Sequence, residues 1–459
     1  MSLSRRRFLT TAAVATLGFP ALLRARNLNS RLQVVAIGCD GKGFDDIKEI
    51  GSHAAVKYVG FCDVDAGRFR HADAAFPGVP HHADFRAMFA QLGDGFDAAI
   101  VSTPDHMHAL PALLAMRMKK HVYLQKPLAH SIEEARLLRL EAARHGVRTQ
   151  MGNQIHSRSE YRTAVRLIQE GRIGKVRATH SWLTNKGNGY TKLATRPPAG
   201  PVPAGLAWDL WLGTAAGRPY APAVYHPFNW RDWLDFGSGT LGDFGCHLLD
   251  PIFTALKLGA PIDAQADSTG LNPETWCEQE TVRWSFPATP FTAPEGVTLH
   301  WYDGGRLPDL ALARMPAGRT LPANGSILVG EHGAMVLPHV GMPTLYPEET
   351  YGLNLSPGER ARRQRRLDAG EKDDRPVATI KPADHRNHYH DWVDAALQGH
   401  ETSANFAYAG PLTEAVLLGT VAARFSGQRL AWDAPGLRIA NHAAADGFVR
   451  KGYRDGWKI

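Results

Sequence analysis

Cysteine is scarce in this sequence, and its spacing excludes the common metal sites. The four cysteines are Cys39, Cys62, Cys246 and Cys277. No two of them follow the Cys-x-x-Cys spacing of structural zinc sites. His385, His388 and His390 also match no usual ligand pattern, and a helix start lined with histidines explains them better. We therefore expect no bound metal.

Cys39 and Cys62 stand at the ends of two expected neighbouring strands. An oxidising compartment would allow a disulfide between them. Two buried free thiols are the alternative, and they are favoured because free cysteine is commonly a small core residue.

A concentrated excess of charge of one sign is also missing. The chain has 52 basic and 45 acidic side chains, a net charge of +7. Five of the arginines lie in residues 1–26, which contain no acidic residue. Without them, 47 basic and 45 acidic side chains leave a net charge of +2. This balance suits an enzyme for small molecules and excludes a strong footprint for nucleic acid.

Long apolar runs are absent as well, so we expect no membrane span. Leu9–Leu23 is uncharged but too short to cross a bilayer, which takes about 20 apolar residues. Arg5, Arg6 and Arg7 precede it, and this arrangement resembles a twin-arginine export signal. The sequence thus predicts a signal segment at 1–30 and a periplasmic or otherwise exported protein. A basic disordered tail is the alternative.

Residues 31–152 alternate between short apolar runs and segments with helical periodicity. Leu32–Ile37 is an apolar run closed by Gly38, and Val56–Cys62 ends at Asp63. Further strands are expected at 97–102 and 121–124, with helices at 65–75, 85–92, 109–118 and 132–145. This alternation predicts an α/β fold with a doubly wound parallel sheet, that is, a Rossmann domain.

The pattern changes after residue 152. Long segments that alternate between apolar and polar residues are found at 175–183, 279–286, 297–302 and 326–329. Alternation of this kind predicts a largely antiparallel sheet with one open face. Residues 385–427 return to helix. We therefore expect residues 153–459 to form a second, α+β domain.

The turn after the first expected strand carries a partial dinucleotide motif. It reads Gly38-Cys39-Asp40-Gly41-Lys42-Gly43. The Gly-x-Gly-x-x-Gly motif lets the backbone approach a pyrophosphate at a helix N-terminus. Gly38 and Gly43 fit its first and third positions. Asp40 stands at the middle position, where the motif has glycine. The neighbouring Gly41 could supply the conformational freedom that this glycine provides.

Asp63, at the end of the second expected strand, suits the ribose of the same nucleotide. A carboxylate there accepts hydrogen bonds from ribose hydroxyls and repels a 2′-phosphate, which favours NAD over NADP. Arg68 could weaken that preference, so NADP remains the alternative cofactor.

Four further motifs carry a resemblance to a known family. They are Ser102-Thr103-Pro104-Asp105-His106-Met107-His108, Gln125-Lys126-Pro127, Gly152-Asn153-Gln154, and the run 237–250 with its Asp-x-x-x-His pair. With these motifs the chain resembles the Gfo/Idh/MocA family, named after glucose–fructose oxidoreductase and inositol dehydrogenase. The family has Glu-Lys-Pro where this chain has Gln125, so a charge beside Lys126 is lost.

The resemblance implies a set of site residues. The cofactor side would be lined by Thr103, Pro104, His108, Gln125, Lys126 and Asn153, and the substrate side by Gln154. The catalytic set would be Lys126, Asp243 and His247. It also implies a homo-oligomer that uses the open face of the second sheet.

The residues themselves support this chemistry. In a helix over 243–256, Asp243, His247 and Asp250 fall on one face opposite an apolar one, as expected of a cleft-lining helix. Histidine titrates near neutrality and suits a general acid/base for a hydroxyl proton. We assign this role to His247, electrostatic stabilisation to Lys126 and orientation to Asp243, and the first two could exchange roles.

The segment before this helix is rich in aromatic residues. Tyr225, Trp230 and Arg231 could bind a sugar ring by stacking and hydrogen bonding. Loop packing explains them equally well.

Three functions remain. The first is a nicotinamide-dependent oxidoreductase acting on a secondary hydroxyl of a sugar, sugar derivative or polyol, with a tightly held cofactor because an exported enzyme cannot recycle loose NADH. The second is a glycosidase or lyase that works by transient oxidation, elimination and re-reduction. The third, a non-catalytic binding protein on the same fold, is disfavoured by the presence of Lys126, Asp243 and His247.

Overall fold

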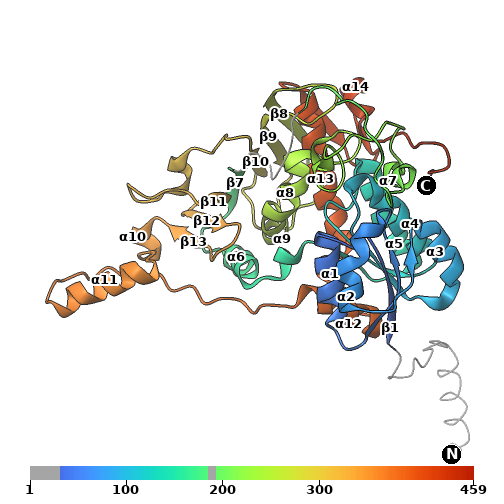
Figure 1. Cartoon of the computed structure of the whole chain (residues 1–459). Helices are drawn as coiled ribbons and strands as arrows, with labels where there is room; N and C mark the ends of the chain where they lie inside the picture. Colours follow the sequence, from blue (N-terminus) through green and yellow to red (C-terminus); the bar gives the residue numbers. More distant parts are fainter. Residues whose placement is uncertain (1–30, 185–192, 459) are drawn as a thin grey trace, which may run out of the picture.

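The computed structural model describes residues 31–184 and 193–458, which form two sheets joined by shared helices (Figure 1). The twin-arginine motif lies outside the described residues. The first sheet consists of β1 (Leu32–Ile37), β2 (Val56–Cys62), β3 (His81–His82), β4 (Ala98–Val101), β5 (His121–Leu124) and β6 (Thr149–Met151). Its helices are α1 (Lys42–Gly51), α2 (Arg70–Ala75), α3 (Phe85–Leu92), α4 (Ala109–Arg117) and α5 (Ile132–His145).

The first sheet has the order β3-β2-β1-β4-β5-β6, and all its pairs are parallel. The chain order reverses beside β1, so the carboxyl ends of β1 and β4 open a crevice there. Local signals fix the helices: α5 starts with a capping box between Ser131 and Glu134 and ends at Gly146 in the left-handed region. The predicted Rossmann domain is confirmed.

The second sheet is built from β7 (Val176–Leu183), β8 (Asp263–Thr269), β9 (Gln279–Phe286), β10 (Val297–Tyr302), β11 (Asn324–Gly330), β12 (Ala334–Pro338), β13 (Thr344–Tyr346), β14 (Arg429–Asp433) and β15 (Arg438–Ile439). Its order is β13-β12-β11-β7-β10-β9-β8-β14-β15. Every pair is antiparallel except β7 with β10. The predicted fold class is therefore confirmed.

The remaining helices belong to the part of the chain after β6. They are α6 (Ser159–Gln169), α7 (Trp208–Leu212), α8 (Gly239–Leu248), α9 (Asp250–Leu256), α10 (Glu348–Tyr351), α11 (Pro357–Asp368), α12 (His388–Gln398), α13 (Phe406–Arg424) and α14 (Ala443–Asp446). α13 packs on the buried face of β9, where the indole of Trp284 donates to the carbonyl of Ala415 at 2.9 Å. Gly419 makes room for this ring, since a Cβ there would lie 2.2 Å from it.

One described helix, α13, has the length and mean hydropathy of a membrane span, which the sequence analysis overlooked. Of its most apolar window, 83% is buried inside the protein. Burial on this scale is typical of a central core helix.

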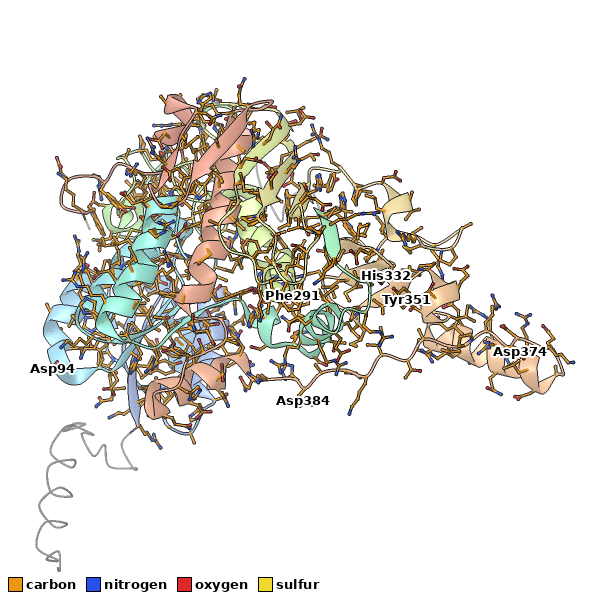
Figure 2. All side chains as sticks on the ribbon, turned by 180° about the vertical axis from the view of Figure 1, so that it is seen from behind. Asp94, Phe291, His332, Tyr351, Asp374 and Asp384 are labelled. Atoms are coloured by element: carbon orange, nitrogen blue, oxygen red, sulfur yellow. The ribbon has the colours of Figure 1, made fainter. Side chains whose placement is uncertain are left out.

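α10 and α11 belong to a segment that projects from the body. Figure 2 shows Asp374 near its outer end and Asp384 on the return path. α11 has no buried residue, and two of its arginines pair within the segment: Arg363 contacts Asp373 at 3.1 Å and Arg366 contacts Glu371.

The first sheet is completed by a helix from the far end of the chain. α12 lies beside α1 and β1 (Figure 1). Trp392 and Val393, fully buried, join a cluster with Leu32, Val34 and Ile47. The Rossmann unit therefore includes a helix that the sequence analysis placed with the second domain.

Replacing Trp392 by alanine tests this joint. The ring is fully buried, so Trp392→Ala should lower the free energy of unfolding by about 3–5 kcal/mol. Urea unfolding followed by circular dichroism measures the change. Leu140→Ala, at a residue 52% exposed on α5, is the control and should cost far less. Equal stability of the two variants would show that α12 is not part of the core.

Candidate active site

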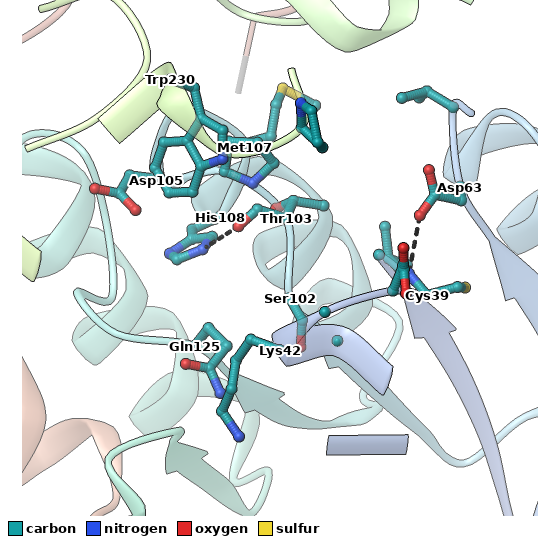
Figure 3. Close-up of a pocket in the computed structure, with 18 of the residues that line it drawn as sticks. Cys39, Lys42, Asp63, Ser102, Thr103, Asp105, Met107, His108, Gln125 and Trp230 are labelled. Atoms are coloured by element: carbon teal, nitrogen blue, oxygen red, sulfur yellow. Dashed lines mark hydrogen bonds between the residues drawn. The ribbon is translucent and has the colours of Figure 1, made fainter. Parts of the chain in front are cut away.

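A cleft runs along the carboxyl edge of the first sheet and continues to α8. It is lined by the turn 37–43, by the residues after β2, β4 and β5, and by α8. Figure 3 shows part of it. The lining contains these predicted site residues: Gly38, Asp40, Gly41, Lys42, Gly43, Asp63, Thr103, Pro104, His108, Gln125, Lys126, Gln154, Trp230, Arg231, Asp243 and His247.

The turn after β1 contains three glycines, and each meets a different steric requirement. A Cβ on Gly38 would lie 2.5 Å from the carbonyl oxygen of Ser102, and one on Gly43 would lie 2.3 Å from that of Gly38. Gly41 has φ +53° and caps α1, with open space on its side-chain face. Gly41 stands one position after the middle glycine of the dinucleotide motif, and it allows the close approach of the backbone to a dinucleotide that this motif requires.

The carboxylate of Asp40 is bound by a neighbouring arginine, Arg68. It accepts from the Arg68 guanidinium at 2.7 Å and lies 3.0 Å from the ring of His71. Burial raises the pKa of Asp40, but the bonds to Arg68 and His71 outweigh it and bring the pKa to about 2. The unusual carboxylate in the turn is therefore neutralised by its neighbours.

Asp63 stabilises the same edge of the sheet. Its two carboxylate oxygens accept the backbone N–H groups of Cys39 at 2.9 Å and Asp65 at 3.0 Å (Figure 3). Burial raises its pKa to about 6. Each oxygen keeps a second lone pair toward the cleft, as a ribose site requires.

Asp46, which was not predicted as a site residue, lies beneath the glycine turn after β1, here called the nucleotide cradle. Its fully buried carboxylate pairs with Lys42 at 2.7 Å and accepts from the Ser102 hydroxyl at 2.8 Å and the Gln125 amide at 2.7 Å. Burial raises the pKa of Asp46, against the attraction of Lys42. An acidic residue four positions after a lysine in a helix usually indicates a surface pair, so no sequence signal marked it.

His108 fixes the turn after β4. Its ring nitrogens lie 2.7 Å from the carbonyl oxygen of Pro127 and 2.8 Å from that of Thr103. Burial lowers the pKa of His108 to about 4, against the contacts with the two carbonyl oxygens, which raise it. Among the described residues, the buried hydroxyl of Thr103 has no hydrogen-bond partner. This open hydroxyl and the glycine turn together fit a dinucleotide.

Lys126, which follows β5, and Asp243, on α8, form an ion pair at the inner end of the cleft. The ammonium donates to the carboxylate of Asp243 and, at 2.7 Å, to its backbone carbonyl. The guanidinium of Arg231 lies 3.7 Å from the other carboxylate oxygen. Asp243 therefore orients Lys126 directly.

His247 is oriented by Asn153. The amide nitrogen of Asn153 donates to the carbonyl of Cys246 at 3.0 Å, so its oxygen faces Nδ1 of His247, 2.5 Å away. Burial, with the charge of Lys126 second, lowers the pKa of His247 well below its ordinary value. The neutral ring thus carries its proton on Nδ1 and presents the Nε2 lone pair. Asn153 was predicted to bind the cofactor, but it is fully buried behind the histidine and does not line the cleft.

Two further expectations were wrong. Tyr225, predicted to bind substrate, is 1% exposed in an aromatic cluster with Trp211, Trp233 and Phe236, because the loop folds on itself. Asp250 does not line the cleft with Asp243: α8 ends at Leu248 and α9 begins at Asp250, with Pro251 in its first turn, and Asp250 pairs with His156 at 2.9 Å.

Asp105 is a second site residue that the sequence analysis did not single out. It lines the cleft, is 5% exposed, and lies in the field of Asp243 and Lys126. Burial, followed by repulsion from Asp243, raises its pKa to about 7. The inner end of the cleft therefore holds two proton-handling groups, this carboxyl and His247.

Aromatic and guanidinium groups form the opposite wall. Trp230 and Arg231 line the cleft with Phe228, and the guanidinium stacks 4.3 Å from both ring centres. This wall can contact the face of a sugar ring and hydrogen-bond its hydroxyls.

The four cysteines are buried free thiols. The Cys39 thiol donates to the carbonyl of Cys62 at 3.4 Å. The three histidines near residue 388 do not gather: His388 contacts Ser157, while His390 contacts Ser52.

Comparison with known proteins agrees with this geometry. The model of the oxidoreductase family with an NAD-binding Rossmann fold, Gfo/Idh/MocA, matches residues 32–153, and the model of its C-terminal alpha/beta domain matches residues 177–284. The chain belongs to the Gfo/Idh/MocA oxidoreductase family. The first match also confirms the predicted NAD-binding domain.

Individual relatives match over shorter stretches. Inositol 2-dehydrogenase 2 of Saccharopolyspora erythraea is 31% identical over 160 residues, 34% of this chain and 46% of that protein. The 2,7-anhydro-N-acetylneuraminate hydratase of Escherichia coli is 33% identical over 124 residues, 27% of this chain and 30% of that protein. The chain thus spans less than half the length of these curated relatives.

A solved structure extends the likeness in fold to nearly the whole chain. The WlbA dehydrogenase of Bordetella pertussis, in complex with NADH and UDP-GlcNAcA, superposes with a TM-score of 0.58 at 15% identity. The match covers 88% of this chain and 98% of that one.

Restoring the family's glutamate at position 125 should destabilise this chain. Gln125→Glu would place a second carboxylate in contact with buried Asp46, at a cost of about 3 kcal/mol at pH 8. The double variant Asp46→Asn/Gln125→Glu should recover most of the loss, and Gln428→Glu, in the exposed turn before β14, should be neutral. Thermal unfolding measures all three. A single variant as stable as the unmodified protein would contradict the role of Asp46.

Proposed function

We propose that the protein is an NAD-dependent oxidoreductase acting on a secondary hydroxyl of a sugar, sugar derivative or polyol. One observation carries this proposal: Lys126, Asp243 and His247 meet at the inner end of the cleft whose outer part is the glycine turn and Asp63. A substrate hydroxyl placed there meets a neutral imidazole, an ammonium and the nucleotide site together.

His247 and Lys126 have separate chemical roles, which follow from their charges. Nε2 of His247 accepts the hydroxyl proton, because Nδ1 is committed to Asn153. The ammonium of Lys126, held by Asp243, donates to the substrate oxygen and stabilises the negative charge that develops on it. NAD, when bound, supplies the hydride acceptor. Gln154, Trp230 and Arg231 line the same space and would orient the substrate.

The neighbours of Arg68 favour NAD over NADP. Its guanidinium is bound by Asp40 at 2.7 Å and Asp65 at 3.2 Å, so its charge is already balanced. A 2′-phosphate would also meet the carboxylate of Asp63. Competition between NADH and NADPH for the purified protein measures this preference.

Export and assembly are part of the proposal. The run Arg5-Arg6-Arg7 supports twin-arginine export to the periplasm or beyond, and a cofactor held through the catalytic cycle. The outer face of β8, β9 and β10 carries polar side chains such as Gln265, Arg283 and Thr298. We expect this face to join subunits of a homo-oligomer, which light scattering would detect.

A second candidate is a glycosidase or lyase that oxidises its substrate only transiently. Asp105 favours it: elimination needs one group to remove a carbon-bound proton and another to protonate the leaving oxygen. His247 and Asp105, with its pKa of about 7, provide two such groups in one cleft. The similarity to a hydratase points the same way.

The decisive experiment is to purify the protein without added nucleotide, denature it and identify any released cofactor by mass spectrometry. NAD(H) in near-stoichiometric amount would support the proposal. Sugars and polyols are then screened for NADH formation, and glycosides for release of the aglycone without net redox change. If the protein neither contains nor binds NAD(H) or NADP(H), the proposed function is refuted.

Two variants link the activity to the site. His247→Asn and Lys126→Met should lower kcat by about 10²–10⁴-fold, the usual contribution of a proton-transfer or electrostatic group. Nucleotide content should stay near that of the unmodified protein. His332→Asn, at an exposed histidine beyond β11, is the control and should be unchanged.

The stability of the protein should depend on the charge of Asp105. Its folded pKa of about 7 lies above its ordinary value of 3.8, so its contribution to stability is present below pH 4 and lost as the pH rises through 7. Asp105→Asn mimics the neutral form and should gain stability over the unmodified protein between pH 5 and 8, by at most about 4 kcal/mol. Thermal unfolding across this range tests it.

Asp455→Asn, on the exposed surface, should show no such dependence on pH. A constant difference between Asp105→Asn and the unmodified protein at all pH values would rule out a protonated Asp105 at neutrality.

A further inference from the structure

The outer half of the cleft is closed by two segments far from the Rossmann domain in sequence. Residues 205–226, which precede α8, form one. Residues 451–458, here called the closing segment, form the other. Figure 1 shows the C-terminus beside α7 and near α4. Both contribute to the lining of the cleft, through Leu210, Trp211 and His226 from the first and Trp457 from the second.

The first of these segments attaches next to the ribose carboxylate. The backbone N–H of Ala207 donates to the carbonyl of Val64 at 2.8 Å, and that of Ala66 donates to Gly205 at 3.0 Å. The ring of His226 lies 2.8 Å from the carboxylate of Asp65. Since Val64 directly follows Asp63, this contact covers the part of the cleft expected to hold the adenosine.

The closing segment is fastened at its start and middle by charged groups. The ammonium of Lys451 donates to the carbonyl of His106 at 2.9 Å and pairs with Glu134 at 3.0 Å. The guanidinium of Arg454 donates to the carbonyls of Gly213 at 3.1 Å and Asp209 at 2.8 Å, and pairs with the Asp209 carboxylate. The segment thus bridges the Rossmann domain and the residues around α7.

These bonds place one aromatic ring in the cleft. Trp457 is 5% exposed, and its ring lies under the guanidinium of Arg86, 4.0 Å from the ring centre. Arg86 also donates to the carbonyl of Gly456 at 3.3 Å. The ring lines the cleft together with Ala83 and Phe85, on the side of Asp63. An aromatic face there is suited to contact a purine base.

We propose that the closing segment is part of the nucleotide site: Trp457 contacts the adenosine half of the bound nucleotide, and the bonds of Arg454 and Arg86 hold it there. Release of the nucleotide then requires the closing segment to detach. This inference rests on the proposed function, because it needs NAD in the cleft, and it provides a physical means of retaining the cofactor between turnovers.

The test measures the rate at which bound NADH leaves the full-length protein, from the loss of its fluorescence on addition of excess NAD. Trp457→Ala should release NADH about 10- to 100-fold faster, as expected for loss of one aromatic contact to a base. Trp457→Phe should restore most of the retention. Asp209→Asn weakens only the hold on Arg454 and should give a smaller acceleration, of about 2- to 5-fold.

The matched control is Asp455→Asn, in the same segment. Its carboxylate is fully exposed and, among the residues that the structure describes, pairs only with Lys458, at 3.6 Å, so the release rate should not change. A folded Trp457→Ala variant with an unchanged rate would overturn the proposal. If that variant does not fold, equal rates for Asp209→Asn and Asp455→Asn would overturn it. Failure of the unmodified protein to bind NADH at all would instead refute the proposed function, and this inference with it.

Discussion

The nucleotide cradle depends on one buried carboxylate, that of Asp46. It binds Lys42 from the first turn of α1, Ser102 from the end of β4 and Gln125 from the end of β5. These three points carry the loops that must stand at fixed distances if a dinucleotide is to fit. A charge so deeply buried is tolerated only because all three partners offer it protons. The same contact explains why position 125 carries an amide.

The proposed catalytic groups are placed by this arrangement. Gln125 sets the end of β5, and the next residue, Lys126, crosses to α8 to meet Asp243. One turn further along α8, His247 is turned by Asn153, which follows β6. Lys126, from the first sheet, is thus held by Asp243 of α8, and His247, from α8, is held by Asn153 at the end of the first sheet.

The sequence was informative where a residue type has one physical use. Apolar runs ended by glycine or aspartate predicted β1 and β2 with their observed bounds, and the helical periodicity of 132–145 predicted α5. Lys126, Asp243 and His247 could be predicted because their motifs are specific.

Other residues could not be predicted because their role depends on distant partners. Asp46 looks like a surface residue until Ser102 and Gln125 are placed beside it. The burial of Asp105 comes from elements that no local pattern links to it, while Tyr225 is buried because its own loop folds on itself. Asp250 was misplaced because one uniform helical periodicity was assumed across the break between α8 and α9 at Leu249.

The return of α12 to the first sheet has a consequence for synthesis on the ribosome. Domains at the start of a chain usually fold as they emerge. Here the cluster around Leu32 and Val34 stays open until Trp392 and Val393 have been made. The nascent Rossmann unit must therefore wait, with an apolar face exposed, for most of the chain to be translated. A chaperone that shields this face during translation would act on β1 and α1, and a chain that stops before residue 388 would never complete it.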